Sequence, residues 1–279
     1  MPDPFKHAPA LTPLQPNTIH ALSVGPPNVL QGERPNRTYN QVSQAELHCF
    51  RPVAAPRARV LLCAGGGYVG LAYDREGAEV AAWLVQAGYE VCVLVHRLPG
   101  AEPAAWPSDI ALRDGQRALA LMVTFPPLPL LLMGLSSGGH LAGALACQAE
   151  AQAALGLVIA YAPLNANHRD YKAPAGKPDF APPQKQAFYN AWPIGMTQEP
   201  RGLPPQPVFL AYALHDTIVP IEHALNFIRS ARDTGLQLDA HIFHEAPHGF
   251  ALRELEGSQR AWPALALDWM ARQLATQGA

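Results

Sequence analysis

The sequence lacks an excess of charge of either sign. It has 20 lysine and arginine residues against 22 aspartate and glutamate residues in 279 positions, so its formal net charge is −2. A nucleic-acid-binding domain usually carries a clear basic surplus, and this chain has none. Charged residues make up only 15% of the chain, whereas hydrophobic residues make up 49%. This balance excludes a disordered chain, favours an extensive buried interior and indicates no nucleic-acid partner.

Long hydrophobic runs are also missing. No apolar stretch approaches the roughly 20 residues that a helix needs to cross a bilayer. The start of the chain, MPDPFKHAPALTPLQP, contains no continuous hydrophobic segment of the kind found in secretory signals. We therefore expect a cytoplasmic protein with no membrane partner. Nothing in the sequence indicates the oligomeric state.

Cysteine is scarce, and no pair has CxxC spacing: the four residues are Cys49, Cys63, Cys92 and Cys147. Each stands among apolar neighbours, which favours buried, reduced thiols over a zinc site or a disulfide framework. Three histidines come close together near the C-terminus, namely His241, His244 and His248. They straddle a predicted strand and a loop, and no carboxylate or thiol completes a recognised ligand spacing. We expect no metal and no cofactor.

Proline, in contrast, is abundant, with 29 residues concentrated in the first 35 positions and between Pro174 and Pro207. Proline lacks an amide hydrogen and interrupts helices and strands, so both stretches are predicted to be irregular. We predict an irregular N-terminal segment over residues 1–35 and a single domain over residues 36–279. An irregular insertion over residues 165–207 is predicted to lie near the functional site.

Elsewhere, short apolar runs alternate with amphipathic, helix-length segments, the pattern of a parallel sheet covered by helices. Several of the runs are continuously apolar, as strands buried on both faces are. The predicted strands are Ala45–Arg51, Val60–Cys63, Glu90–Val95, Leu128–Met133, Leu155–Ala160, Val208–Leu214 and Leu238–Phe243. The predicted helices are Arg75–Gly88, a helix from an N-cap at Ser108 to about Val123, Ser137–Glu150, Ile221–Thr234 and Ser258–Leu274. This order predicts an α/β fold with a mostly parallel, doubly wound sheet.

A GxSxG motif stands between a predicted strand and a predicted helix, in the run Gly134-Leu135-Ser136-Ser137-Gly138. In a nucleophile elbow, a strained turn exposes the serine hydroxyl, and small residues two positions away let the strand and helix approach. Only Ser136 fits, because Ser137 would need a glycine where Leu135 stands. The alternative is a serine- and glycine-rich turn without chemistry.

A serine nucleophile needs a base and an orienting carboxylate, which follow it in the order acid and then histidine. Asp216 comes directly after the predicted strand Val208–Leu214, and His248 follows the next predicted strand. Catalytic groups of open α/β sheets gather at the carboxyl ends of the strands, so both should lie near Ser136. The alternatives are that Asp216 caps the following helix and that His244 is the base.

The three glycines of Ala64-Gly65-Gly66-Gly67-Tyr68 follow the predicted strand Val60–Cys63. Glycines let backbone amides approach a developing oxyanion, so Gly66 and its neighbours are candidate donors, together with the amide of Ser137. A phosphate-binding loop is the weaker interpretation, because no GxxxxGK pattern follows.

Four motifs, AGGGY, GLSSGGH, HD..VP and APHGF, together resemble the α/β-hydrolase superfamily. The match is most similar to bacterial acetyl esterases of the acetylxylan-esterase-like and hormone-sensitive-lipase-like branches, and it covers about residues 45–275. The segments His96-Arg97-Leu98-Pro99 and Trp106-Pro107 also resemble sequences of these esterases. The resemblance implies an α/β-hydrolase fold with Ser136 as nucleophile, His248 as base, Asp216 as acid, and Gly65, Gly66 and Ser137 at the oxyanion hole.

Two positions depart from the resemblance: Ala64 stands where many relatives have histidine, and Ser137 replaces a common alanine. The proline-rich start carries no amphipathic period, so we expect no large cap domain. Tyr68, Phe250 and Trp192 are candidate walls of a substrate pocket, although ordinary packing is an alternative for these aromatic side chains.

These features together predict a serine carboxylesterase acting on small-molecule esters with short acyl groups, acetyl above all, including acetylated sugars or xylo-oligosaccharides. A serine peptidase of the prolyl-oligopeptidase type is a second interpretation, because its catalytic domain shares the same arrangement. A hydrolase-fold protein that binds a ligand without turnover is a third.

Overall fold

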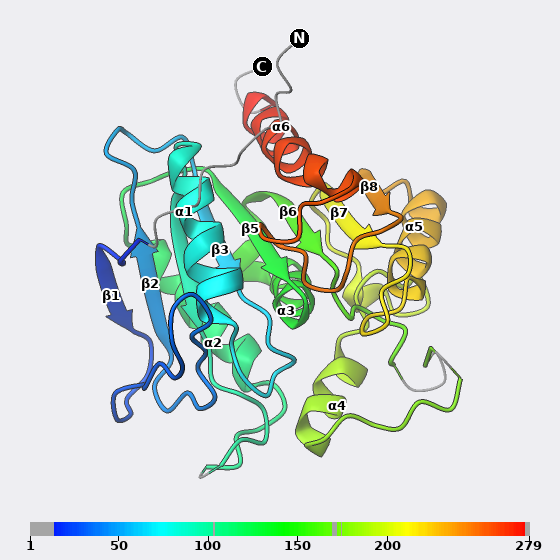
Figure 1. Cartoon of the computed structure of the whole chain (residues 1–279), viewed down its shortest axis with the longest axis horizontal. Helices are drawn as coiled ribbons and strands as arrows, with labels where there is room; N and C mark the ends of the chain where they lie inside the picture. The colour runs from blue at the N-terminus through cyan, green and yellow to red at the C-terminus, as the bar shows by residue number, and fades with distance from the viewer. Residues whose placement is uncertain (1–13, 103, 169–171, 174, 277–279) are drawn as a thin grey trace.

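The computed structural model describes residues 14–276, apart from residues 103, 169–171 and 174. Its strands form one eight-stranded sheet in the order β1-β2-β4-β3-β5-β6-β7-β8 (Figure 1). The strands are β1 Thr18–Ala21, β2 Glu46–Phe50, β3 Arg59–Cys63, β4 Glu90–Val95, β5 Leu130–Leu135, β6 Ala154–Ala160, β7 Val208–Ala213 and β8 Leu238–Phe243. β1 pairs antiparallel with β2, and β2 antiparallel with β4, whereas the other pairings are parallel. The predicted mostly parallel sheet is confirmed.

Helices cover both faces of this sheet (Figure 1). They are α1 Glu79–Gln86, α2 Ile110–Met122, α3 Ser137–Ala146, α4 Pro183–Ala191, α5 Glu222–Thr234 and α6 Trp262–Ala275. Side chains of α1 and α6 belong to one hydrophobic cluster, and side chains of α2, α3 and α5 belong to the other. Among the described residues, no helix combines the length and the apolar character needed to span a membrane.

Strand β3 explains why the central runs are continuously apolar. Val60 and Leu62 pack into the cluster with α1 and α6, whereas Leu61 and Cys63 pack into the opposite cluster. Successive side chains of a strand point to opposite faces, so a strand covered on both sides needs apolar residues throughout. The same geometry brings the loops after β3, β5, β7 and β8 toward the carboxyl edge of the sheet.

The structure corrects the prediction that the two proline-rich stretches are irregular throughout. Residues 1–13 lie outside the described residues, but Thr18–Ala21 forms β1, which was expected to be irregular. Four residues paired to one neighbour are too short to leave a clear alternating pattern. The insertion between β6 and β7 contains α4, which has Pro183 in its first turn. Proline is tolerated there because the first amides of a helix lack intrahelical acceptors.

Several predicted boundaries are also wrong. The strand predicted as Leu128–Met133 is β5, which begins and ends two residues later, at Leu130 and Leu135. Pro129 has no amide hydrogen to donate to a neighbouring strand, and its carbonyl oxygen accepts from the Arg59 amide. The helix predicted from Arg75 begins as a π-helical turn, Tyr73–Ala78, before α1. Ser108 is not the N-cap of α2, a position that Asp109 occupies without a side-chain cap. The helix predicted as Ser137–Glu150 ends at Ala146.

The four cysteines are free thiols. Cys49 of β2 stands directly opposite Cys92 of β4, and their sulfur atoms are 3.0 Å apart. Sequence spacing gave no indication of this pair, because the register between two distant strands creates it. Within the described ranges, no three histidine, cysteine, aspartate or glutamate side chains come together as a metal site would require.

Candidate active site

Ser136 occupies a strained turn between β5 and α3. Its backbone has φ 50° and ψ −129°, a region that non-glycine residues rarely adopt. A Cβ atom on Gly134 would lie 2.2 Å from the carbonyl oxygen of Gly138, and one on Gly138 would lie 2.1 Å from that of Cys63. Both glycines are therefore required by packing, as the motif predicted. The turn leaves Ser136 9% exposed, at the carboxyl end of a central strand.

Three side chains from separate loops form one hydrogen-bonded chain. Oγ of Ser136 lies 3.1 Å from Nε2 of His248, and Nδ1 of His248 lies 2.7 Å from Oδ2 of Asp216. The Asp216 side chain is fully buried, and that of His248 is 20% exposed. If Nδ1–H donates to the carboxylate, Nε2 is left to accept from the serine hydroxyl. This arrangement can take a proton from Ser136 and return it to a leaving group.

Neither alternative raised for the acid and the base is what the structure shows, since the N-cap of α5 is Ile221 and not Asp216. Oδ1 of Asp216 accepts hydrogen bonds from the amides of Ile218 and Val219, at 2.8 and 2.9 Å. Asp216 therefore also organises the turn before α5, and these two bonds fix the carboxylate that faces His248. His244 is exposed, and its ring packs edge-on against that of His215 at 5.0 Å, so it is not the hydrogen-bond partner of Ser136.

The backbone amides of the glycine loop after β3 differ in their hydrogen-bond partners. The Gly65 amide donates to Oε2 of Glu76 at 2.8 Å, and the Gly67 amide donates to Oγ of Ser137 at 2.8 Å. Gly66, with φ +137°, and Ser137, the first residue of α3, donate to no acceptor among the described residues. The expectation that Gly65 supplies an oxyanion donor is therefore corrected, since Glu76 occupies its amide. The amides of Gly66 and Ser137 stay available for a developing oxyanion.

Glu76 is a site residue that sequence reasoning missed. It lies in the π-helical turn and is 5% exposed, and its Oε1 accepts from the hydroxyl of Tyr161 at 3.3 Å. Burial raises the pKa of Glu76, while the hydrogen bond from the Gly65 amide acts in the opposite direction.

His140 joins the glycine loop to the insertion. Nδ1 of His140 accepts from the hydroxyl of Tyr68 at 2.9 Å, and its Nε2–H donates to the carbonyl oxygen of Trp192 at 2.8 Å. Burial lowers the pKa of His140 to about 4, so the ring is neutral at neutral pH. Tyr68 on the loop, α3 and the end of α4 are held together by this one imidazole.

The three aromatic residues predicted to wall a pocket lie in different environments. Tyr68 is buried among His140, Phe188 and Tyr189, and Phe250 is buried against Tyr161, so both side chains contribute to core packing. Trp192 is half-exposed, and the guanidinium of Arg201 lies 4.9 Å from its ring centroid. Of the three, only Trp192 has a side chain open to solvent.

A model of the prolyl oligopeptidase family matches residues 125–277, more than half of the chain and the part that holds Ser136, Asp216 and His248. The chain belongs to the prolyl oligopeptidase family. The match includes three of the four motifs that resembled an α/β-hydrolase, while the AGGGY motif lies before it.

Known proteins similar to this family member include enzymes of ester hydrolysis. An acetylxylan esterase from Xylanibacter ruminicola is 24% identical over 218 residues, which are 74% of this chain and 44% of the relative. The chain thus spans less than half the length of that curated relative.

Among solved structures, a sugar hydrolase from Lactococcus lactis has a TM-score of 0.68 at 20% identity, covering 86% of this chain and 99% of that one. An acetyl ester-xyloside bifunctional hydrolase from Caldicellulosiruptor lactoaceticus has a TM-score of 0.66 at 19% identity, covering 93% and 97%. A carboxylesterase from Lactobacillus plantarum has a TM-score of 0.60 at 20% identity, covering 85% and 96%. These similarities confirm the predicted α/β-hydrolase fold.

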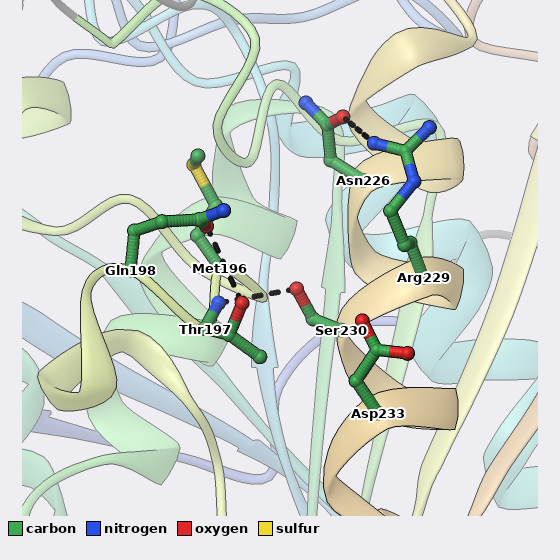
Figure 2. A pocket seen from close by; sticks show the side chains of 7 residues that line it. All are labelled: Met196, Thr197, Gln198, Asn226, Arg229, Ser230 and Asp233. Carbon is green, nitrogen blue, oxygen red and sulfur yellow. Dashed lines mark hydrogen bonds between the residues drawn. The ribbon is translucent and has the colours of Figure 1, made fainter.

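A separate pocket of about 110 Å³ lies between α5 and the turn at residues 196–198 (Figure 2). Two pairs of its lining residues are hydrogen-bonded: the Thr197 amide donates to Oγ of Ser230 at 3.1 Å, and Arg229 donates to Asn226 at 3.4 Å. This pocket is not lined by Ser136, His248 or Asp216. We interpret this pocket as a polar junction that ties the insertion to α5.

Proposed function

We propose that this member of the prolyl oligopeptidase family is a serine carboxylesterase that hydrolyses short-chain acyl esters, acetyl esters in particular. The observation that carries the proposal is the hydrogen-bonded chain from Ser136 through His248 to Asp216, with distances of 3.1 and 2.7 Å. A serine hydroxyl is a weak nucleophile at neutral pH, and an oriented imidazole next to it removes that limitation.

In the proposed reaction, Oγ of Ser136 attacks the ester carbonyl carbon while Nε2 of His248 takes the hydroxyl proton. The amides of Gly66 and Ser137 stabilise the negative charge that develops on the carbonyl oxygen. The carbon–oxygen bond to the alcohol then breaks, and His248 returns its proton to the departing alcohol. Water, activated by the same imidazole, releases the acyl group and regenerates Ser136. Asp216 holds the imidazole and stabilises its charged form.

The proposed substrate class follows from the similarity to two proteins. One is an acetylxylan esterase, and a structure of the same fold is an acetyl ester-xyloside bifunctional hydrolase. We propose that acetylated sugars or xylo-oligosaccharides are the substrates, with Trp192 as a candidate wall for the sugar. Sugar rings pack well against an exposed indole because it offers a large apolar face next to polar groups.

A panel of p-nitrophenyl acetate, butyrate and octanoate, together with acetylated xylo-oligosaccharides, tests the proposal. We expect the highest kcat/KM on the acetate, release of acetate from the oligosaccharides, and no turnover by Ser136→Ala with an unchanged circular dichroism spectrum. Turnover retained by Ser136→Ala would remove the serine mechanism. Labelling by a fluorophosphonate probe separates an enzyme from a silent binding protein, which would not be labelled.

A peptidase is the second candidate, and the family match to prolyl oligopeptidases favours it. Both activities use the same serine and histidine, so Ser136→Ala does not distinguish them. Turnover of Ala-Pro-p-nitroanilide by the wild-type protein, measured beside the acetate ester, does. Preference for the anilide would replace the esterase proposal.

A further inference from the structure

Glu76 is a buried carboxyl group that the hydrolytic steps above do not use. It lies 11 positions after Gly65, in the π-helical turn Tyr73–Ala78 that follows the glycine loop. Isolated π-turns are uncommon and are found frequently at functional sites. A buried carboxyl group costs free energy unless its oxygens have hydrogen-bond donors, and both oxygens of Glu76 have one.

The segment around Glu76 fixes Gly65 through both of its backbone polar groups. The Gly65 amide donates to Oε2 of Glu76 at 2.8 Å, and the Gly65 carbonyl accepts from the Ala72 amide at 2.8 Å. Gly65 is also wedged between the carboxyl group and the nucleophile: a Cβ atom on it would lie 2.4 Å from Oε2 of Glu76 and 2.6 Å from Cβ of Ser136. The Gly65 carbonyl and the Gly66 amide belong to one planar peptide, which the Ala72 amide holds, whereas Glu76 holds the preceding peptide through the Gly65 amide. The two bonds together fix the backbone of Gly65 and with it the direction of the Gly66 amide.

The second oxygen of Glu76 reaches the segment that carries the base. Oε1 accepts from the Tyr161 hydroxyl at 3.3 Å, and the ring of Tyr161 packs edge-on against that of His248 at 5.2 Å. A Cβ atom on Gly249 would lie 3.7 Å from the same oxygen. The carboxyl group therefore sits where the glycine loop, the nucleophile and the loop of His248 meet.

We propose that Glu76 is a positioning residue: by holding the Gly65 amide, it fixes the backbone of Gly65 so that the following Gly66 amide is directed at the oxyanion. This inference rests on the proposed function, because it concerns the oxyanion of that reaction. The Gly66 donor contributes fully only in the tetrahedral state, so disturbing its direction lowers kcat rather than raising KM.

Three variants test the role of Glu76 with p-nitrophenyl acetate. Glu76→Ala leaves the Gly65 amide without its acceptor, and we expect kcat to fall on the order of 10²-fold with KM changed less than about threefold. Glu76→Gln keeps an oxygen that can accept from Gly65, so it should retain kcat within about tenfold of wild type. Glu79→Gln is the matched control, because Glu79 lies three positions further along and pairs with Arg253, away from Ser136.

Hydrogen exchange at the Gly65 amide gives a measurement that does not depend on turnover. We expect exchange to be at least about tenfold faster in Glu76→Ala than in wild type or Glu79→Gln, since a hydrogen-bonded buried amide is protected. If Glu76→Ala does not fold, Glu76→Asp replaces it, because the shorter side chain withdraws the carboxylate from Gly65. Glu76→Asp should then be less active than Glu76→Gln.

The outcomes separate the two proposals. A wild-type protein that does not turn over the ester contradicts the proposed function, while the exchange measurement still tests the contact. If the wild-type protein turns over the ester, three results would overturn the positioning role alone. They are an unchanged kcat in Glu76→Ala, a change in Glu76→Ala that is confined to KM, and a higher activity of Glu76→Asp than of Glu76→Gln.

Discussion

The amide of Gly67 donates a hydrogen bond to the side-chain oxygen of Ser137, 2.8 Å away. Ser137 therefore acts on the glycine loop through its hydroxyl as well as through its own backbone amide. We predict that Ser137→Ala lowers kcat/KM for p-nitrophenyl acetate about five- to tenfold, the effect of one hydrogen bond of about 1 kcal/mol. Steady-state kinetics measures this, with Ser258→Ala, an exposed serine, as control. Equal activity of the two variants would show that the hydroxyl does not hold the loop.

The choice between His248 and His244 gives the second prediction. We expect His248→Asn to lower kcat by several orders of magnitude, because no imidazole then accepts the Ser136 proton. His244→Asn should retain activity within about twofold, since an exposed side chain away from the reacting groups usually contributes little. Single-turnover measurements with a chromogenic ester check both variants. A larger loss in His244→Asn would mean that the base has been assigned to the wrong residue.

Much of the sheet could be predicted because its local signals agree with the tertiary structure. The run Val60–Cys63 is apolar at every position, and the strand is buried on both faces. The proximity of Ser136, Asp216 and His248 also followed from sequence, because each stands just after a parallel strand and such strand ends share one edge. Their catalytic roles stay predictions until the kinetics are measured.

The role of Glu76 could not be predicted, because it depends on a local departure from regular helix. A carboxylate in a segment with a period of 3.6 residues is usually read as part of a solvated face. Here the π-helical turn rotates Glu76 toward Gly65, which removes that amide from the predicted donors. Contacts set by strand register, such as that between Cys49 and Cys92, likewise leave no local signal.

A buried ion pair after β4 gives the third prediction. Arg97 donates to both carboxylate oxygens of Asp114, at 3.0 and 2.6 Å, and its guanidinium lies 4.5 Å from the ring centroid of Trp106. Removing one partner leaves a buried charge uncompensated, so Asp114→Asn should lower the free energy of unfolding by about 3–5 kcal/mol. Urea denaturation measures the change.

A matched pair on the same helix provides the control for Asp114. Asp109 pairs with Arg113 in an exposed i,i+4 arrangement, so Asp109→Asn should cost less than about 1 kcal/mol. The double variant Arg97→Met/Asp114→Leu should be more stable than Asp114→Asn, because it removes both charges and keeps apolar volume. Similar losses for Asp114→Asn and Asp109→Asn would contradict this account.

His223 gives the last prediction, which concerns pH. Its Nδ1 accepts hydrogen bonds from the amides of Asn165 and Ala166, both at 2.9 Å, so protonation of Nδ1 would break two bonds. Burial lowers the pKa of His223 to about 3. The unfolded chain, with a histidine pKa of about 6.5, therefore binds more protons than the folded chain below that pH, and stability falls as the pH drops from about 6.5 to about 3.

At pH 5 this linkage destabilises the folded chain by about 2 kcal/mol relative to pH 8. The side-chain oxygen of asparagine can replace Nδ1 as acceptor without titrating, so His223→Asn should reduce the difference in unfolding free energy between pH 8 and pH 5 by that amount. Urea denaturation at both pH values measures it, with His244→Asn, an exposed histidine, as control. An unchanged pH dependence in His223→Asn would mean that another group causes the acid sensitivity, and His140, with its pKa of about 4, would be the next to replace.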